Sequence, residues 1–438
     1  MAVVPVVRTE ESGTDVPGKA DAPISRVAWY VLLMLVLINV TNYIDRSMIS
    51  IVLEPVKKEF GLTDSQLGTL SGLAHAAAYA VFGVPLGMLV DRVNRARLLA
   101  FMLFIWSGMT ALASQMTSYL GLLMTRAAVG GAESGGVPTS VSLISDYFPA
   151  RRRATAIGFF FAAGPIGFAI SFAIGGYLVA HFGWRLTFLA AGVPGFILAA
   201  VLLFTVRDPR AALKPVAQQS AEPPAPLRLV VATVFRNRPL CAAVTAMVLS
   251  ALTTSAFWGW IASFLIRVHG MSVQNVGFLI ALTAVSSGLL GGLLGGVLSD
   301  RFSHGSSRRA AYFIATVHLL ILPPAIVTLT ANNLVLLFGA MAFWQLLLPM
   351  YLGPAYGICI SLTPGRMRGT MLSFIQTFSN LLGAGIGPFV IGKLSDVIGG
   401  DMSLRYAMLS VVAINVLTAF LYWLAARNIQ PQHQQAAA

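Results

Sequence analysis

The segment RVAWYVLLMLVLINVTNYIDRSMISIVLE, from Arg26 to Glu54, is almost wholly apolar, and between its two ends its only charges are Asp45 and Arg46. A helix needs about 20 predominantly apolar residues to span the hydrocarbon of a membrane. An ionisable side chain at that depth is costly, and it usually faces a bundle interior or a water-filled path for a substrate or a proton. The segment therefore predicts a membrane protein with a polar site inside it.

The composition of the whole chain agrees with this interpretation. Of its 438 residues 57% are hydrophobic and 10% are charged, and the mean hydropathy is +0.78. A soluble domain carries about 25% charged residues. We predict an all-α polytopic membrane protein with twelve spans, at 27–53, 65–90, 97–116, 119–145, 154–180, 185–206, 240–267, 273–299, 309–330, 333–361, 369–395 and 403–426.

The basic residues are distributed asymmetrically between the two sides of these spans. With a cytoplasmic N-terminus, the outside connections hold only six of the 29 Lys and Arg residues, namely Lys57, Lys58, Arg185, Arg267, Lys393 and Arg405. An excess of Lys and Arg in cytoplasmic loops sets the orientation of helical membrane proteins. The net charge of +13 therefore indicates topology rather than a nucleic-acid partner. We expect both termini in the cytoplasm, in the inner membrane of a bacterium.

Six spans precede a polar break at 207–239 and six follow it. Its Pro-rich centre, AEPPAP at 221–226, is typical of a linker, and the amphipathic LRLVVATVFRNR after it predicts a helix on the membrane surface. We divide the chain into a disordered cytoplasmic tail (1–25), a six-helix bundle (26–206), this linker (207–239), a second six-helix bundle (240–426) and a cytoplasmic C-terminal tail (427–438).

Two motifs repeat between the halves. GMLVDR at 87–92 follows the second span and returns as GVLSDR at 296–301 after the eighth. PARRRAT at 149–155 returns as PGRMRGT at 364–370, at nearly the same offset. Internally repeated six-helix halves are typical of transporters that alternate access around a site near the membrane midplane.

The loop GMLVDRVNRAR at 87–97 resembles the loop signature of the major facilitator superfamily, with Asn94 where that family usually has Gly. The resemblance implies two six-helix bundles and a cytoplasmic ion network that holds the halves together in the outward-open state. We assign to this cytoplasmic gate Asp91, Arg92, Arg95, Asp146, Arg151, Asp300, Arg301 and Arg368. The alternative is that these charges only anchor loops at the level of the lipid headgroups.

Four charges lie within the predicted spans: Asp45, Arg46, Arg126 and Glu133. Helix geometry places Asp45 and Arg126 nearly level and Glu133 about two turns away on the face of Arg126, so we expect pairs of Asp45 with Arg126 and of Arg46 with Glu133. Protonating either acid would free an Arg to bind an anionic group. We predict Asp45 and Glu133 as proton-coupling residues and the two arginines as substrate ligands. A purely structural double ion pair is the alternative.

The second half has no deeply buried charge, but its spans carry polar and aromatic side chains. We predict Trp258, Gln345, Gln376 and Asn380 as substrate-binding residues on this side, although ordinary packing is an alternative for each. An ionic wall facing an aromatic, neutral wall suits an amphipathic anion with an acidic head and an apolar body. His75, in the second span, is open between a proton relay and a packing residue.

Three stretches resemble the spinster family of that superfamily: NYIDR at 42–46, the charged helix and loop at 126–155, and AGPIG at 163–167. The sequence departs from the family at Ala132-Glu133-Ser134, where the family usually has Gly-Glu-Ala. The resemblance covers the first half well and the second by topology alone. It implies a lysophospholipid or a sphingoid phosphate as the substrate. In the first stretch we also predict Asn42 and Tyr43 as substrate-binding residues.

Other substrates remain open at this stage. Anion:proton symporters of the same superfamily import sugar acids and carry a similar Asn/Cys-Tyr-x-Asp-Arg motif, and a drug-efflux exchanger is a third candidate. We predict a proton-coupled secondary transporter, monomeric and surrounded by membrane lipids, with a small amphipathic anion as its substrate and no cofactor besides the proton as coupling ion. We expect no catalytic or metal site, because no nucleophile–base set or metal-ligand spacing accompanies the carboxylates.

Overall fold

The computed structural model of the chain describes residues 25–90, 92–212 and 226–430, which form helices and no strand. The helices of the first half are α1 (Arg26–Phe60), α2 (Asp64–Gly68), η1 (Thr69–Leu73), α3 (Ala74–Val90), α4 (Arg95–Ala113), α5 (Tyr119–Glu133), α6 (Gly136–Tyr147), α7 (Ala150–Phe161), α8 (Ala163–Thr205) and η2 (Pro209–Ala212). Those of the second half are α9 (Leu227–Arg236), α10 (Arg238–His269), α11 (Val273–Ser303), α12 (Ser307–Thr330), α13 (Leu334–Leu347), η3 (Leu348–Tyr351), α14 (Leu352–Ser361), η4 (Gly365–Met367), α15 (Arg368–Phe378), η5 (Ser379–Gly385), α16 (Ile386–Ile398), α17 (Ser403–Val412) and α18 (Ile414–Asn428). The predicted tails, 1–25 and 427–438, and the Pro-rich centre of the linker lie largely outside the described residues.

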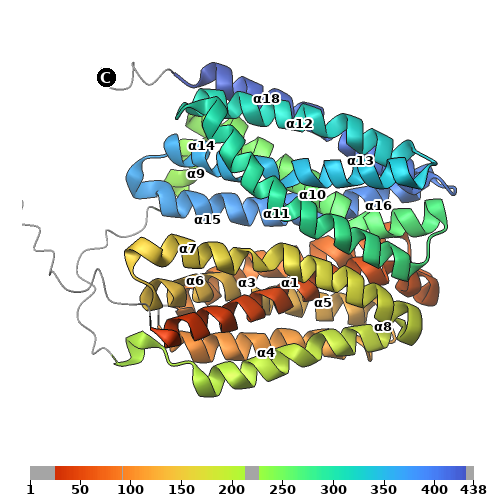
Figure 1. The fold of residues 1–438 in the computed structure, drawn as a ribbon, viewed down its shortest axis with the longest axis horizontal. Helices are drawn as coiled ribbons and strands as arrows, with labels where there is room; N and C mark the ends of the chain where they lie inside the picture. Colours follow the sequence, from red (N-terminus) through yellow and green to blue (C-terminus); the bar gives the residue numbers. More distant parts are fainter. Residues whose placement is uncertain (1–24, 91, 213–225, 431–438) are drawn as a thin grey trace, which may run out of the picture.

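These helices make twelve membrane crossings in the described part of the chain. Ten segments are long and apolar enough to span a bilayer. One of them, Arg151–Thr205, crosses twice, because Gly183 breaks α8 with φ 78° and ψ 168°. The fourth span is the pair α5 and α6, interrupted at Ser134 and Gly135. The predicted fold of two six-helix halves is confirmed, and Figure 1 shows the halves side by side.

The first helix is longer than predicted. Helix α1 runs through Pro55 to Phe60 instead of ending near residue 53. A proline removes one backbone hydrogen bond from a helix, and here it does not end the helix. The added turns carry Glu54 and Lys57 away from the end of the molecule where α1 begins and α18 ends (Figure 1). The end where α1 begins and α18 ends is termed the terminal end, and the opposite end of the molecule is termed the distal end.

At the distal end the two halves approach to backbone contact. A Cβ on Gly277 of α11 would lie 2.2 Å from the Phe172 carbonyl oxygen of α8. A Cβ on Gly72 of η1 would lie 2.6 Å from the carbonyl oxygen of Gly385 in η5. Both η1 and η5 are π-helical, so a π-helical turn of each half meets the other across the interface. Glycine permits such close approach of helices, and the halves are joined here.

Gly277→Val is expected to lower the melting temperature, because a side chain at this position would force α8 and α11 apart. Overpacking of this kind costs about 1–3 kcal/mol. Thermal unfolding of the purified protein measures it. Gly292→Ala, on the same helix with no atom within 4 Å of its added Cβ, is the matched control and should leave the melting temperature unchanged or slightly raised. Equal melting temperatures for the two variants would contradict the prediction.

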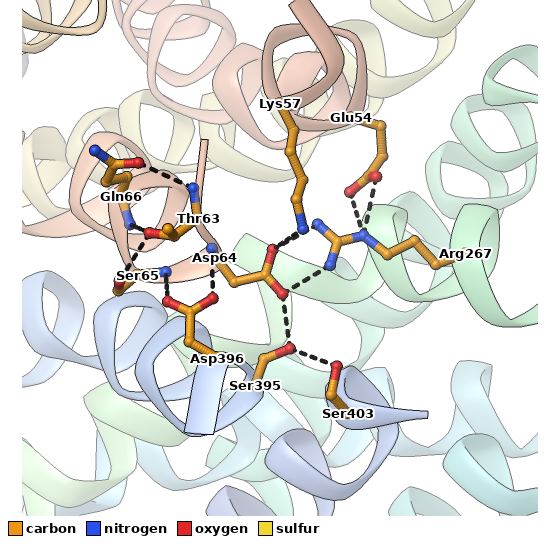
Figure 2. Close-up of polar contacts among 10 residues, drawn as sticks. All are labelled: Glu54, Lys57, Thr63, Asp64, Ser65, Gln66, Arg267, Ser395, Asp396 and Ser403. Atoms are coloured by element: carbon orange, nitrogen blue, oxygen red, sulfur yellow. Dashed lines mark hydrogen bonds and ion pairs between the residues drawn. The ribbon is translucent and has the colours of Figure 1, made fainter. Parts of the chain in front are cut away.

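A cluster of charges also joins the halves at the distal end (Figure 2). It consists of Glu54, Lys57 and Asp64 of the first half and Arg267, Ser395 and Asp396 of the second, and is termed the distal network. Figure 2 shows the Arg267 guanidinium between the carboxylates of Glu54 and Asp64. Arg267 donates to both Asp64 oxygens, at 2.8 and 2.9 Å, and its Nε donates to Glu54 at 2.9 Å. Such forked pairing is geometrically specific.

The rest of the distal network fixes the start of α2. Lys57 lies 2.6 Å from Asp64, and the Ser395 hydroxyl donates to Asp64 at 2.7 Å. The Asp396 carboxylate accepts the backbone N–H groups of Asp64 and Ser65, each at 2.8 Å. Backbone N–H groups at a helix N-terminus favour an anion. A helix of one half is therefore capped by an acid of the other half.

Candidate functional site

A cavity of about 510 Å³ lies between the two halves. Its polar and aromatic lining includes Tyr43, Arg46, His75, Tyr79 and Arg126 from the first half and Trp258, Gln345, Tyr351, Gln376 and Asn380 from the second. Seven of the eight residues predicted to bind substrate thus line one cavity. The floor towards the distal end includes Ser71, Ala384 and Pro388, close to where η1 meets η5.

Asn42 is the exception, and its assignment to the cavity was wrong. It lies beside Trp106 and Phe160 in a small internal gap of the first half. Adjacent residues on a helix point about 100° apart. Because Tyr43 faces the cavity, with its ring against Gly164 and 5.7 Å from the ring of Phe168, Asn42 is turned into the bundle.

The two carboxylates lie behind the cavity wall rather than on it. Asp45 and Glu133 are 0% and 1% exposed, and neither lines the cavity. Both Asp45 carboxylate oxygens are buried without a hydrogen bond from the described residues. Arg126 reaches α1 as predicted, but its Nη2 donates to the Asp45 backbone carbonyl, at 3.2 Å, rather than to the carboxylate. The Nε and Nη1 atoms of Arg126 are buried and have no hydrogen-bond partner within the described part of the chain.

The expected pair of Arg46 with Glu133 does not form, because Glu133 is hydrogen-bonded to another residue. Its Oε2 lies 2.8 Å from Nε2 of His75, a residue of α3. Helix rise gives the height of a residue but not which neighbouring helix it faces, and α3 packs closer to Glu133 than the Arg46 side chain does. Arg46 lines the cavity and makes no hydrogen bond or ion pair with the described residues. Two guanidinium groups therefore border the cavity, and neither is hydrogen-bonded to a carboxylate.

The second half contributes neutral polar groups to the cavity. Gln345 is 2% exposed, and both its amide oxygen and its amide nitrogen are buried without a partner in the described residues. Gln376 accepts a hydrogen bond from the Tyr356 hydroxyl at 2.7 Å. The Trp258 ring packs 5.2 Å from the ring of Phe168 of the first half. An amide with both groups unpaired is costly unless a ligand or water satisfies it.

At the terminal end, Arg95 forms an ion cluster within the first half. Its Nη2 lies 2.7 Å from Asp146, another residue assigned to the gate but of the same half, and its Nη1 donates to Ser142 at 2.8 Å. Its strongest partner was not predicted: Asp208, just after α8, receives the backbone N–H of Arg95 at 2.8 Å and its Nε at 3.1 Å. Arg210 lies 3.0 Å from Asp146. The cluster ties the α3–α4 loop to the segment that follows α8.

Five further residues of the predicted gate make no hydrogen bond or ion pair between the halves within the described ranges. Arg92, Arg151, Asp300, Arg301 and Arg368 are exposed, and Arg368 donates to the Thr363 carbonyl oxygen of its own half at 3.4 Å. Asp91 lies outside the described residues. The physical reason is that the halves meet at the distal end, which leaves their terminal ends apart. A network of the outward-open state cannot be formed here, so the assignment of a gate stays a prediction.

Asp208→Asn is expected to destabilise the first half by about 1–3 kcal/mol, because a neutral amide with one acceptor oxygen replaces the charged carboxylate that accepts from both the backbone and the guanidinium of the buried Arg95. Burial raises the pKa of the Asp208 carboxyl, but the hydrogen bonds from Arg95 outweigh this and hold the pKa below its usual range. The stabilisation is therefore complete above the unfolded-state pKa of about 3.9 and is lost as the pH falls through the folded-state pKa. Thermal unfolding against pH should show the difference from wild type shrinking only in strong acid. Asp300→Asn, an exposed acid near the same end, is the control.

The sequence interpretation missed Asp208 and the distal network. A signal existed for both. Asp208 is the second residue of the RDPR stretch directly after the sixth span, at the same end of the bundle as Arg95. Glu54, Lys57, Asp64 and Arg267 all flank span ends on the side assigned to the outside, where opposite charges can meet. The described ranges contain no group of three or more His, Cys, Asp and Glu side chains that could hold a metal ion.

Comparison with known proteins supplies relatives along the whole chain. It is 29% identical to an "MFS-type efflux pump" of Mycolicibacterium smegmatis, over 93% of this chain and 94% of that protein. It is 26% identical to a "Probable L-galactonate transporter" of Escherichia coli, over 94% of each chain. The crystal structures of a bacterial homologue of the human lysosomal transporter Spinster, in inward-facing unoccupied and occupied conformations, superpose with a TM-score of 0.79 at 26% identity, over 92% of this chain and 98% of that one.

The likeness to the Spinster homologue confirms the resemblance found in the sequence, and its inward-facing form agrees with halves that meet at one end. The family profile described as Major Facilitator Superfamily matches residues 35–388, which is most of the chain. The protein therefore belongs to the Major Facilitator Superfamily and is a secondary transporter of the membrane, not an enzyme.

Proposed function

We propose that this transporter carries a small hydroxylated organic anion, such as a sugar acid, together with protons across the inner membrane of a bacterium. The proposal also holds that the protein is a monomer among membrane lipids with both termini in the cytoplasm. The observation that carries it is the pair of guanidinium groups, Arg46 and Arg126, which border the cavity without a hydrogen-bonded carboxylate. Arginine binds carboxylate and phosphate through two parallel hydrogen bonds.

The opposite wall favours a substrate that is polar along its length. The unpaired Gln345 amide offers one acceptor and two donors to whatever fills the cavity. Hydroxyl groups of a sugar acid would satisfy them, whereas the alkyl chain of a lipid would leave them buried and unpaired, at a cost of about 1–3 kcal/mol for each group. A sugar acid therefore ranks before an amphipathic lipid, which reverses the order that the sequence suggested. The L-galactonate relative supports the same order.

The charges of the site support coupling to a proton. Asp45, Glu133, Arg46 and Arg126 sum to zero when both acids are ionised. One proton makes the set positive, and a monovalent anion restores neutrality. Buried charge is least costly when it is balanced, so proton and anion favour each other's binding. With the termini in the cytoplasm, the sealed distal end faces outward, and the described conformation is the one that exchanges cargo with the cytoplasm.

An amphipathic anionic lipid is the second candidate. It is favoured by the aromatic side chains of the cavity, where Trp258 packs against Phe168 and Phe161 also contributes to the wall. It is favoured also by the likeness to the Spinster homologue. In this case the head group would lie at the same arginines.

The test is a binding screen on the purified protein by thermal shift and by isothermal titration. D-glucuronate, L-galactonate and galactarate represent the first candidate, and lysophosphatidylglycerol and sphingosine phosphate the second. We expect at least one sugar acid to stabilise the protein and D-glucose, which has hydroxyl groups but no carboxylate, to have no effect. Tetraphenylphosphonium, an apolar cation, tests a drug exchanger. Stabilisation by the lipids or the cation alone would reject the sugar-acid proposal.

A further inference from the structure

We infer that His75 is the group through which Glu133 exchanges its proton with the cavity. The inference rests on the proposed function, because it gives the coupling carboxylate a route for its proton. His75 lines the cavity and lies 2.8 Å from Glu133, whereas the Glu133 side chain is completely buried and does not line the cavity. Of the described side chains, His75 is the only one hydrogen-bonded to Glu133. It stands between this carboxylate and the water of the cavity.

The second nitrogen of the imidazole, Nδ1, can exchange a proton with the cavity. Nε2 faces Glu133, and Nδ1 has no hydrogen-bond partner among the described residues. A neutral imidazole has one donor and one acceptor nitrogen, so with Nε2–H donated to Glu133 the Nδ1 atom is a proton acceptor. The ring also stacks on Tyr79, with centroids 6.0 Å apart, which limits its rotation. These contacts hold both nitrogens in place.

The backbone fixes the pair as well. A Cβ on Gly130 of α5 would lie 2.3 Å from the His75 carbonyl oxygen, so α3 and α5 touch at this residue. Gly130 and Glu133 lie about one turn apart on α5. The close approach therefore brings the His75 ring within hydrogen-bond distance of Glu133. A larger residue at 130 would separate the two helices where the pair forms.

The transfer balances without another reactant. A cavity water in its protonated form gives a proton to Nδ1, and Nε2 releases its proton to Oε2 of Glu133. The imidazole ends neutral with its tautomer exchanged, Glu133 ends as a carboxylic acid, and the site has gained one positive charge. The reverse sequence returns the proton. Histidine commonly shuttles protons in this way.

The surrounding charges agree with this role. The titratable and charged groups that face the pair are Asp45 and Arg46 of α1, Tyr79 of α3 and Arg126 of α5. Helix η5 of the other half, which packs on α3, has no titratable residue. The two arginines disfavour a lasting positive charge on His75, and an anion bound to them removes that disadvantage. Arrival of the anion thus promotes the transfer.

The decisive variant is His75→Gln, whose amide can still donate to Glu133 but cannot pass a proton through. Proteoliposomes are assayed with the sugar acid that binds best in the screen, by uptake under a pH gradient and by counterflow, which needs no net proton movement. We expect the ratio of pH-driven uptake to counterflow to fall about tenfold or more relative to wild type, the size of a typical coupling between two sites. His181→Gln, an exposed histidine away from the cavity, should behave as wild type. Unchanged pH-driven uptake in His75→Gln, with the wild-type pH profile, would overturn the inference.

Infrared titration of the purified protein separates this inference from the proposed function and needs no substrate. The carboxylic-acid band that Glu133→Gln removes should appear in wild type at the same pH as the change in the His75 imidazole bands, identified with labelled histidine. Transfer through the ring requires the two changes to coincide. Two results would overturn the inference. One is that the two changes occur at clearly different pH. The other is that the Glu133 band in His75→Gln responds to a change of pH as fast as it does in wild type. If wild type transports no sugar acid, the proposed function fails while this measurement still decides the role of His75.

Discussion

Arg46→Gln is expected to lower the affinity for the transported anion by about 100-fold. Removing one partner of a desolvated, hydrogen-bonded charge pair costs about 2–5 kcal/mol. In this protein the guanidinium has no hydrogen bond or ion pair with the described residues, so its removal breaks no such contact within the protein. The loss should therefore appear in binding and hardly in the melting temperature.

Isothermal titration of the sugar acid into wild type and variant measures this effect. Arg46→Lys is the informative companion, because it keeps the charge and loses the planar fork of donors, and it should bind with intermediate affinity. Arg126→Gln should lose affinity too, but it also removes the bond to the Asp45 carbonyl, so a lower melting temperature is expected there. An unchanged affinity in Arg46→Gln would place the anionic group elsewhere.

Arg267→Gln is expected to open the distal end. Arg267 is the one cation of the distal network that comes from the second half, and it holds Glu54 and Asp64 of the first. The side chain of Asp64 is 5% exposed and those of Arg267 and Glu54 are 19% exposed, so removing Arg267 costs less than the about 3–5 kcal/mol of a fully buried pair. About 5.5 kcal/mol inverts a 99:1 equilibrium between two states, so a partial shift is expected. Because Asp64 keeps Lys57 and Ser395, the first half itself remains paired. The variant should populate a conformation with separated distal ends.

Spin labels at Lys58 and Val397, exposed positions on the distal ends of α1 and α16, measure the separation by double electron–electron resonance. The native Cys241 and Cys359 are first replaced by Ala. A longer distance population is expected in Arg267→Gln. The matched control is Arg185→Gln, which breaks the Arg185–Glu59 pair at the same end but within one half. Identical distance distributions in the two variants would show that the distal network does not hold the halves.

The membrane spans could be predicted from sequence because each needs only local information. Apolar runs of sufficient length locate them, and they set the helix boundaries well except at α1. The apolar run predicted an end near residue 53, but the helix continues through Pro55 to Phe60, and Glu54 and Lys57 on the added turns have partners at the distal end. Those partners belong to distant parts of the chain. A local pattern cannot contain them.

The candidate site was predicted as a set of residues but not as a set of pairs. Buried charges are rare enough that Asp45, Arg46, Arg126 and Glu133 could be selected directly. The pairing of Glu133 depended instead on how close α3 comes to α5, which Gly130 decides through its contact with the His75 backbone. Height along a helix was calculable from the sequence. The direction of each side chain around its helix was not.

The unequal contents of the two halves bear on how such a protein can change its cargo over evolutionary time. The ionisable groups around Glu133 all belong to the first half, while Gln345 and Trp258 lie on the other wall of the cavity, each on a helix that carries none of those groups. A single substitution at Gln345 can therefore alter which molecule is accepted without disturbing the carboxylates that are proposed to use the proton gradient. A lineage can therefore change its substrate through residues of the second half while the proposed proton-coupling residues of the first half stay unchanged.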